Sequence, residues 1–239
     1  MKITLMHFTP LNICSNAIRT CWQSFDKGDD GGEKDIALIE RVGNKYKHSS
    51  TLEHLQYSFY IQGISRACLQ ELARHRIASY SVKSSRYTLK ELKDEKPFLD
   101  TQNPQNPQNF NPQNPQNPQN LNLQNPQNPP NLDSTNFARV SKYIILTGDP
   151  MIDSASINAL ENLRILLQSK SNDFAKYAMP ECYKTELMWS INARSLQNFL
   201  TLRTAKSALW EIRKLAHAVY DAIPKEHKFI YDECIKGDL

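Results

Sequence analysis

The chain has 239 residues, of which 40% are hydrophobic and 23% charged, and its formal net charge is +4. These averages exclude fibrous and wholly disordered classes of protein, and so mild a charge does not by itself indicate a nucleic-acid partner. No run approaches the roughly 18 apolar residues of a membrane span, and the start is too polar for a secretory signal, so we expect no membrane partner. Five scattered cysteines without a CxxC pair favour reduced thiols in the cytoplasm.

Alternating and helical patterns of apolar residues predict a mixed α/β domain with more helix than strand. In chain order we expect a strand at 2–8, a turn-rich loop at 28–34, a helix at 35–42, a strand at 55–62 ended by Gly63, and helices at 65–79 and 154–176. The longest helical pattern runs from Ser195 to Ile223 and is closed by Pro224. The predicted fold therefore includes a long C-terminal helix.

An internal stretch, residues 102–131, differs in composition from the rest of the chain, with 11 Asn, 8 Gln and 8 Pro among 30 positions. Proline at every third position prevents helices and sheet ladders and favours polyproline II, so we interpret the stretch as a disordered surface loop. A PxxP ligand for an aromatic groove is the alternative interpretation. The other 239 − 30 = 209 residues carry every charged side chain, and we predict a single domain over residues 1–239 interrupted by this loop.

Groups that bind anions gather in the basic segment RHRIASYSVKSSRY. Arg74, Arg76 and Arg86 offer planar guanidinium groups suited to bidentate contact with a phosphate or an acidic imide edge. Ser84 and Ser85 add hydroxyl and backbone donors directly before Arg86. Because the seven glycines form neither GxGxxG nor GxxxxGK[ST], we expect a nucleotide phosphate to bind here. Taken alone, the segment is equally well interpreted as a solvated basic helix end.

A second polar segment, INARSLQNFLTLR, lies at the head of the long predicted helix. Arg194 and Asn198 are four residues apart and share a helix face, and Asn192 flanks the start, where unsatisfied backbone N–H groups attract anions. An asparagine amide both donates and accepts, as reading the edge of a heterocycle requires. By itself the pattern is more typical of helix capping with exposed polar residues.

Two further residue groups suggest other chemistries. The histidines and carboxylate of HSSTLEH, residues 48–54, invite a metal-site interpretation, but no further ligand group completes the set, so we expect no metal. Cys182 is a candidate nucleophile, but nothing in the sequence supplies its base, and a packing thiol is favoured. Ser84 also lacks a general base spaced beside it, so we assign it to binding.

Three of these segments together resemble the flavin-dependent thymidylate synthases. Arg74-His75-Arg76, followed after seven residues by Ser84, matches the RHR-x7-S signature of that family. The segments HSSTLEH and INARSLQNFLTLR resemble other blocks of the family, in its order and spacing. The resemblance covers essentially the whole chain apart from 102–131.

The resemblance implies a homotetramer of α/β (α+β) subunits whose active sites are shared between subunits. It also implies tightly bound FAD and the reductive methylation of dUMP to dTMP, with methylenetetrahydrofolate as carbon donor, NADPH as reductant and tetrahydrofolate as product. The FAD-binding residues would be His48, Ser50 (from a neighbouring subunit), Arg74, His75, Arg76, Ile77, Val82, Asn192, Arg194 and Asn198. The dUMP-binding residues would be Glu71, Arg74, Ser84, Ser85, Arg86, Lys176 and Arg203.

On this resemblance Arg203 would be the catalytic residue, contacting the uracil and favouring ionisation at N3, because a guanidinium stabilises negative charge as it develops on the ring. The chain departs from the family pattern at Val82, which offers only backbone contacts. Lys176 stands where some members have an arginine, and it keeps the charge but loses the bidentate fork. Neither departure touches Arg74, Arg86 or Arg203, so we expect an active enzyme.

Two alternative hypotheses stay open at this point. The basic segment could be a surface for RNA or DNA, which requires aromatic stacking residues beside it, and only Tyr80 and Tyr87 answer that description. We therefore favour no nucleic-acid partner. The second alternative is a family member that binds flavin and nucleotide but has lost methyl transfer.

Deleting residues 102–131 should leave assembly and turnover nearly unchanged, because each doubling of loop length costs only about 0.6 kcal/mol of closure free energy. Gel filtration and an assay of dTMP formation measure the two properties. Loss of either one would show that the repeat has a structural or gating role.

Overall fold

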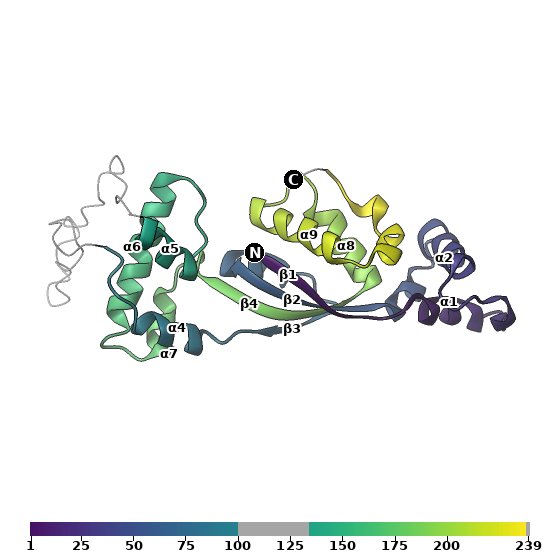
Figure 1. Ribbon diagram of the computed structural model, residues 1–239, viewed down its shortest axis with the longest axis horizontal. Coiled ribbons are helices and arrows are strands. Elements are labelled where there is room, and N and C mark those ends of the chain that lie inside the picture. The colour runs from purple at the N-terminus through teal and green to yellow at the C-terminus, as the bar shows by residue number, and fades with distance from the viewer. Residues whose placement is uncertain (100–133, 238–239) are drawn as a thin grey trace. The chain divides into compact units, whose positions relative to one another are not determined.

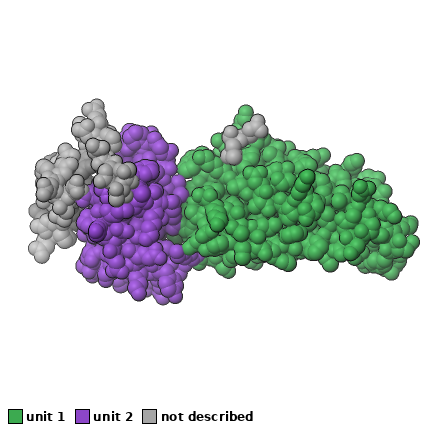
Figure 2. Space-filling view, viewed as in Figure 1, with its two compact units in different colours: residues 1–82, 185–239 green, residues 83–184 purple. Residues whose placement is uncertain are grey.

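The computed structural model describes residues 1–99 and 134–237, and these form two compact units, coloured differently in Figure 2. Unit 1 combines Met1–Val82 with Thr185–Leu239, and unit 2 is Lys83–Lys184. Both ends of the chain therefore contribute to unit 1, and unit 2 is an insertion in its sequence.

Two sequence predictions concern this division. The loop predicted at 102–131 lies outside the described residues. No pattern of residues marked the boundaries after Val82 and Lys184, and the single domain over 1–239 stays a prediction.

Unit 1 is built on a four-stranded sheet with the strand order β1-β2-β4-β3 (Figure 1). Its strands are β1 (Lys2–Phe8), β2 (Gln56–Ser65), β3 (Ala78–Val82) and β4 (Lys184–Asn192). β1 runs antiparallel to β2, and β3 runs antiparallel to β4. The strands predicted at 2–8 and 55–62 are confirmed. β2 continues past Gly63, where we expected it to end, because glycine adopts the φ of +70° found there without strain.

Helices α8 and α9 lie against one face of this sheet (Figure 1). The helices of unit 1 are α1 (Leu11–Thr20), α2 (Glu33–Ile39), α3 (Arg66–Leu72), α8 (Ala193–Arg203) and α9 (Trp210–Ala222). Its shorter segments are the 3-10 turns η1 (Phe25–Lys27), η3 (Ser49–His54), η7 (Lys225–Ile230) and η8 (Asp232–Cys234), and a π-helix, η2 (Glu40–Lys45). The helix predicted at 35–42 is formed by α2 and the start of η2.

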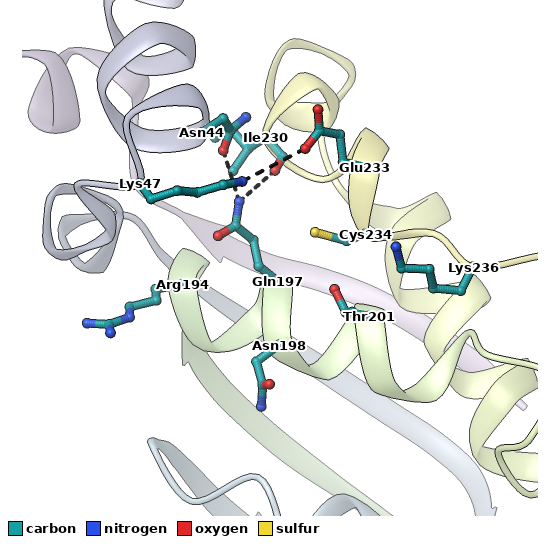
Figure 3. A pocket seen from close by; sticks show the side chains of 10 residues that line it. All are labelled: Asn44, Lys47, Arg194, Gln197, Asn198, Thr201, Ile230, Glu233, Cys234 and Lys236. Atoms are coloured by element: carbon teal, nitrogen blue, oxygen red, sulfur yellow. Dashed lines mark hydrogen bonds and ion pairs between the residues drawn. The ribbon is translucent and has the colours of Figure 1, made fainter.

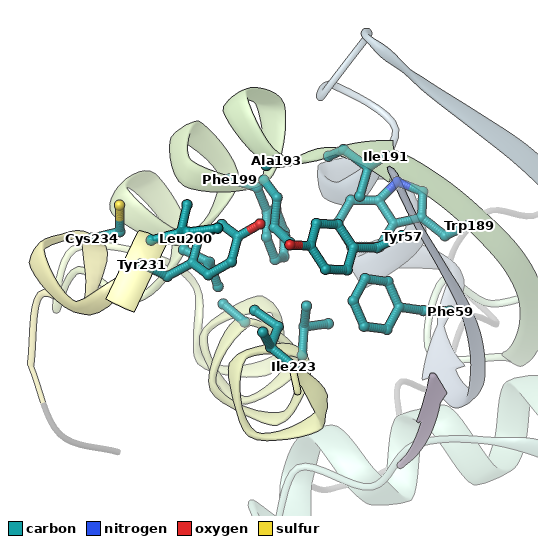
Figure 4. Packing of buried hydrophobic residues seen from close by; sticks show 14 of the residues in the cluster. Tyr57, Phe59, Trp189, Ile191, Ala193, Phe199, Leu200, Ile223, Tyr231 and Cys234 are labelled. Atoms are coloured by element: carbon teal, nitrogen blue, oxygen red, sulfur yellow. The ribbon is translucent and has the colours of Figure 1, made fainter. Parts of the chain in front are cut away.

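Aromatic rings fill the core between the sheet and these two helices (Figure 4). The ring of Trp189, on β4, lies 5.9 Å from that of Phe59 on β2 and 5.0 Å from that of Phe199 on α8, centroid to centroid. All three side chains are fully buried. Aromatic pairs of this kind contribute about 0.5–1.5 kcal/mol beyond the area they bury. They therefore fix the position of α8 over the sheet, and with it the polar residues that α8 carries.

The long C-terminal helix predicted from Ser195 to Ile223 is wrong, because α8 and α9 are separate helices. The break begins at Thr204, whose fully buried hydroxyl donates to the carbonyl oxygen of Leu200 at 2.7 Å. The same hydroxyl accepts the backbone N–H of Lys236 at 2.9 Å. A side chain that bonds the backbone in this way competes with the regular helical ladder, which explains a break without glycine or proline.

Unit 2 is helical, with its described elements at α4 (Ser85–Lys93), α5 (Ser134–Tyr143), α6 (Pro150–Leu166), α7 (Asn172–Ala175) and η6 (Lys176–Ala178). The single helix predicted at 154–176 is therefore wrong. α6 starts earlier because Asp149 caps it, accepting two backbone N–H groups of its first turn, with Pro150 at the first helical position. A polar run, QSKSN, then gives no apolar face to continue. The apolar face predicted for this helix is confirmed, because its residues Leu160, Leu163 and Leu167 are all fully buried.

No helix within residues 1–99 or 134–237 is both long enough and apolar enough to cross a membrane.

A buried carboxylate anchors the start of α3, the helix that leads into the predicted signature. Glu211, on α9, accepts the backbone N–H of Ser65 at 2.8 Å and its hydroxyl at 2.5 Å. Ser65 in turn caps α3 by accepting the N–H of Cys68. We expect Glu211→Ala to lower the free energy of unfolding by about 2–3 kcal/mol, since hydrogen bonds to charged groups are worth that much and the Ser65 donors lose their partner.

Urea denaturation measures this effect. Glu211→Gln is the matched control, because it keeps one acceptor oxygen and should cost less. Equal and negligible losses in both variants would contradict the anchoring role.

Candidate active site

The RHR segment, residues 74–76, lies in a turn between α3 and β3 and not in the helix predicted over 65–79. The α3 helix stops at Leu72 because Tyr80, on β3, directs its hydroxyl back to the helix end. That hydroxyl donates to the carbonyl oxygens of Leu72, at 2.9 Å, and His75, at 2.6 Å. Carbonyl groups at a helix end otherwise lack partners, so Tyr80 holds both the helix end and the turn in place.

Arg203, the last residue of α8, is bonded to two residues of the α3–β3 segment. Its Nη1 donates to Oε2 of Glu71 at 2.8 Å, and its Nη2 donates to the Glu71 carbonyl oxygen at 3.2 Å. Its Nε donates to Nε2 of His75 at 3.0 Å. Only 15% of the Arg203 side chain is exposed. Folding thus brings together three residues that the resemblance assigned to ligand binding, and it holds the guanidinium in one orientation.

His75 is a neutral base in this cluster. The residue is 7% exposed, and its ring packs edge-on against Phe199 with the centroids 5.0 Å apart. Burial, together with the charges of Arg203 and Arg74, lowers the pKa of His75 to about 4. Because Nε2 accepts the Arg203 N–H, the single ring proton resides on Nδ1. His75 therefore orients Arg203 without adding a second positive charge beside it.

Around this cluster, other residues assigned to FAD present exposed side chains. Arg74 contacts Glu71 only at 3.4 Å, and Arg76 is exposed. Ile77 is 73% exposed although it is apolar, and Val82, on the edge strand β3, is also exposed. Guanidinium groups beside uncovered apolar side chains suit a ligand that has both an anionic part and a flat apolar part.

The head of α8 combines a cap with an open polar face. Oδ1 of Asn192 accepts the backbone N–H of Ser195 at 2.8 Å, so the helix-capping interpretation is confirmed for this residue. Arg194 and Asn198 are both exposed, and Arg194 donates to Glu53 at 2.6 Å. Both residues line a cavity of about 420 Å³ within unit 1 (Figure 3).

His48 and Ser50 lie exposed at the start of η3, which packs against α8. In the parts of the chain that the structure describes, no three His, Cys, Asp or Glu side chains are grouped so that they could hold a metal ion. The exposed faces of η3 and α8 therefore offer hydroxyl, imidazole and amide groups to a ligand.

In unit 2, the serines and arginine of the signature lie at the start of α4. Ser84 caps the helix, with its hydroxyl 3.3 Å from the backbone N–H of Arg86. The Arg86 guanidinium donates to both carboxylate oxygens of Asp173, on α7, at 3.2 and 3.3 Å. Lys176 directly follows α7 and is exposed. In unit 2, Ser84 and Arg86 thus lie at the start of α4, and Lys176 lies just after α7, the helix that packs against α4.

Comparisons with known proteins decide the family. The chain matches the family profile described as thymidylate synthase complementing protein over residues 4–227. It is 55% identical to the flavin-dependent thymidylate synthase of Campylobacter jejuni, with 100% of both chains covered, and 56% identical to that of Wolinella succinogenes, with 97% of each covered. It is also similar to a crystal structure of thymidylate synthase X from Helicobacter pylori with FAD and dUMP, at 49% identity and a TM-score of 0.82, covering 99% of this chain and 100% of that one. The chain belongs to the flavin-dependent thymidylate synthases.

Family membership makes the chain an enzyme and confirms the resemblance inferred from its three segments. The mixed α/β fold is confirmed as well. The nucleic-acid alternative loses one of its two aromatic residues, because Tyr80 packs against the core and turns its hydroxyl inward. In this flavin-dependent synthase, Tyr80 instead stabilises the turn that contains His75.

Sequence reasoning missed two residues that shape the site. Tyr80 was recognised only as a stacking candidate, although Ala78, Tyr80 and Val82 alternate as strand residues do. Asp173, which holds Arg86, had no signal at all, because a lone acidic residue 87 positions away does not reveal its partner.

The low pKa of His75 predicts a specific pH dependence of stability. An unfolded histidine titrates near pH 6.5, so the contribution of neutral His75 is fully present above that pH and is lost as the pH falls from about 6.5 to about 4. In His75→Gln, which keeps an acceptor for Arg203, the free energy of unfolding should fall less over this range. Urea midpoints of both proteins between pH 4.5 and 7.5 measure the difference. Parallel curves would show that His75 does not titrate with a lowered pKa.

Proposed function

We propose that this enzyme converts dUMP to dTMP in the cytoplasm, using methylenetetrahydrofolate as carbon donor and NADPH as reductant. The observation that carries the proposal is the largely covered guanidinium of Arg203, held by both His75 and Glu71, in a chain so similar to a protein solved with FAD and dUMP. Such a group is suited to stabilise an anionic pyrimidine ring.

The residues of unit 1 fit a flavin dinucleotide. Exposed Arg74 and Arg76 match its pyrophosphate, exposed Ile77 offers apolar contact to a flat ring, and Val82 would contribute backbone contacts. The remaining groups that would hold it are His48, Ser50, His75, Asn192, Arg194 and Asn198. Of these, Asn192 uses its oxygen as a helix cap, so its amide N–H is the group left for the ligand. When bound and reduced by NADPH, the flavin would supply the hydride that completes the methyl group.

In unit 2, the fit to a nucleotide phosphate is equally direct. Ser84, Ser85 and Arg86 lie at the N-terminus of α4, where backbone donors favour an anion, and Lys176 adds a positive charge. Arg86 must exchange Asp173 for the phosphate. Both partners of this ion pair are more than half exposed, and exposed pairs contribute only about 0.2–1 kcal/mol, so a dianion can displace the carboxylate.

Arg203 would act on the uracil. A guanidinium has five N–H donors, and the contacts with Glu71 and His75 use three of them, so two remain for the substrate. Those two would hydrogen-bond the pyrimidine and stabilise the anion formed on loss of the N3 proton, which makes C5 more nucleophilic. Glu71 and Arg74 would complete the same pocket.

We further propose that the enzyme is a homotetramer with active sites shared between subunits, Ser50 reaching the flavin of a neighbour. Trp22, Phe174 and Tyr177 are each more than three-quarters exposed, and burying such large apolar side chains between subunits would favour association. The family match spans both units, which supports treating them as one functional domain.

Replacing Arg203 tests the catalytic proposal. Arg203→Ala should reduce dTMP formation by about a hundredfold or more, the cost of losing one preorganised donor group, while the yellow flavin stays bound. Arg203→Lys should fall between, since it keeps the charge without the fork. Arg41→Ala, at an exposed arginine of unit 1, is the control. Normal turnover by Arg203→Ala would remove the residue from its role.

The whole function is tested with the purified protein and with cells. We expect a yellow protein that oxidises NADPH faster when dUMP is present, and a gene that rescues cells requiring thymidine. A colourless protein that takes up no added FAD would refute the proposal. Flavin and dUMP binding without rescue would instead favour a family member that has lost methyl transfer.

A further inference from the structure

The cavity beside Arg194 and Asn198 extends beyond the residues assigned to the flavin. Its volume is about 420 Å³, in the range of small-molecule sites. Its lining also includes Asn44 of η2, Lys47 just after η2, and Lys236 of the C-terminal segment (Figure 3). None of these three has a role in the function proposed above.

The lining is positively charged. Its charged lining residues are Lys47, Arg194, Lys236 and Glu233, and because Arg194 is already paired with Glu53, the two lysines against Glu233 leave 2 − 1 = +1. The ammonium of Lys47 lies 3.9 Å from Glu233, and the two side chains are 70% and 87% exposed. A pair so long and so exposed holds its partners weakly, so Lys47 is available to an incoming anion.

The backbone holds Lys47 at the cavity in an uncommon conformation. Its φ is +56°, a region that non-glycine residues seldom adopt. It follows η2, a π-helix, a form that is frequent at functional sites. A Cβ at Gly43 would meet the Leu52 side chain at 2.9 Å, so the glycine allows η2 to pack closely against η3. The strained backbone at Lys47 is maintained by the structure around it, and strain of this kind is often found at binding sites.

The cavity wall is also fixed by amide groups. Nε2 of Gln197, on α8, donates to Oδ1 of Asn44 at 3.0 Å and to the carbonyl oxygen of Ile230 at 2.8 Å. Nδ2 of Asn44 donates to Glu40 at 2.6 Å. These bonds join α8, η2 and η7, so the cavity is formed before any ligand arrives.

We propose that this cavity binds the anionic end of a co-substrate, with Lys47 and Lys236 as its contacts. The inference rests on the proposed function, in which Arg194 and Asn198 hold the flavin. A co-substrate that exchanges a hydride or a carbon unit at the flavin must place its reactive end there, and its remote end then lies in the adjoining space. Both co-substrates end in oxyanions, the glutamate carboxylates of the folate or the phosphates of the nicotinamide dinucleotide. The dUMP phosphate is already assigned to unit 2.

The test compares Lys47→Ala, Lys236→Ala and the double variant with Lys225→Ala, an exposed lysine of unit 1 outside the cavity. Each single cavity variant should raise the KM of one co-substrate about three- to fivefold, the factor that an exposed charge pair contributes, with kcat unchanged. The KM of the parent should rise with ionic strength, and that of the double variant should rise less. A larger effect with triglutamylated than with monoglutamylated folate would show that the cavity binds the folate carboxylates. An effect on the KM of NADPH alone would show that it binds the phosphates of the dinucleotide.

Direct binding keeps this test separate from the proposed function. Titration calorimetry of the FAD-loaded protein with methylenetetrahydrofolate and with NADP⁺ should show the same loss of affinity, even in a protein that makes no dTMP. Unchanged affinity for both ligands in the double variant would overturn the inference. Loss of FAD from the cavity variants would also overturn it, because the lysines would then serve the cofactor.

Discussion

A guanidinium at the end of α8 is bonded to an imidazole and a carboxylate that lie 128 and 132 residues earlier in the chain, respectively. This contact of Arg203 with His75 and Glu71 joins the helix that covers the sheet to the turn that carries the RHR segment. It also decides the electrostatics of the site. The carboxylate of Glu71 compensates the positive charge of Arg203, and the neutral ring of His75 adds no second charge beside it. Two N–H donors of the guanidinium remain available for substrate.

The rest of unit 1 supports that contact from both sides. The rings of Trp189 and Phe199 fix α8 over the sheet, and Phe199 also packs against the imidazole of His75. From the other side, Glu211 anchors the start of α3 through Ser65, and Tyr80 caps its end. A site built on rigid elements and locked by such neighbours keeps its geometry without a ligand, which is what stabilisation of a developing charge requires.

Local signals predicted several elements of the fold correctly but failed at some of their ends. The alternation in β1 and β2 and the buried leucines of α6 were visible because burial imposes a period on each element. The helix predicted through residue 79 was wrong because the Tyr80 hydroxyl, on β3, caps α3 at Leu72. Helix propensity cannot predict a hydrogen bond that comes from a neighbouring strand. The long C-terminal helix failed at Thr204 for a similar reason, since its buried hydroxyl binds a backbone segment 32 residues away. The contacts of Arg203 with His75 and Glu71 were not predicted, because the resemblance assigned these residues only to ligands and spacing along a chain does not reveal which side chains meet.

A double-mutant cycle between Glu71 and Arg203 tests the central claim most directly, with kcat/KM for dTMP formation measured for Glu71→Gln, Arg203→Lys and the double variant. If Glu71 acts mainly by orienting Arg203, the double variant should be no slower than Arg203→Lys alone, because the carboxylate then has no fork to hold. Losses that multiply in the double variant would show that the two residues act independently, and would contradict the account.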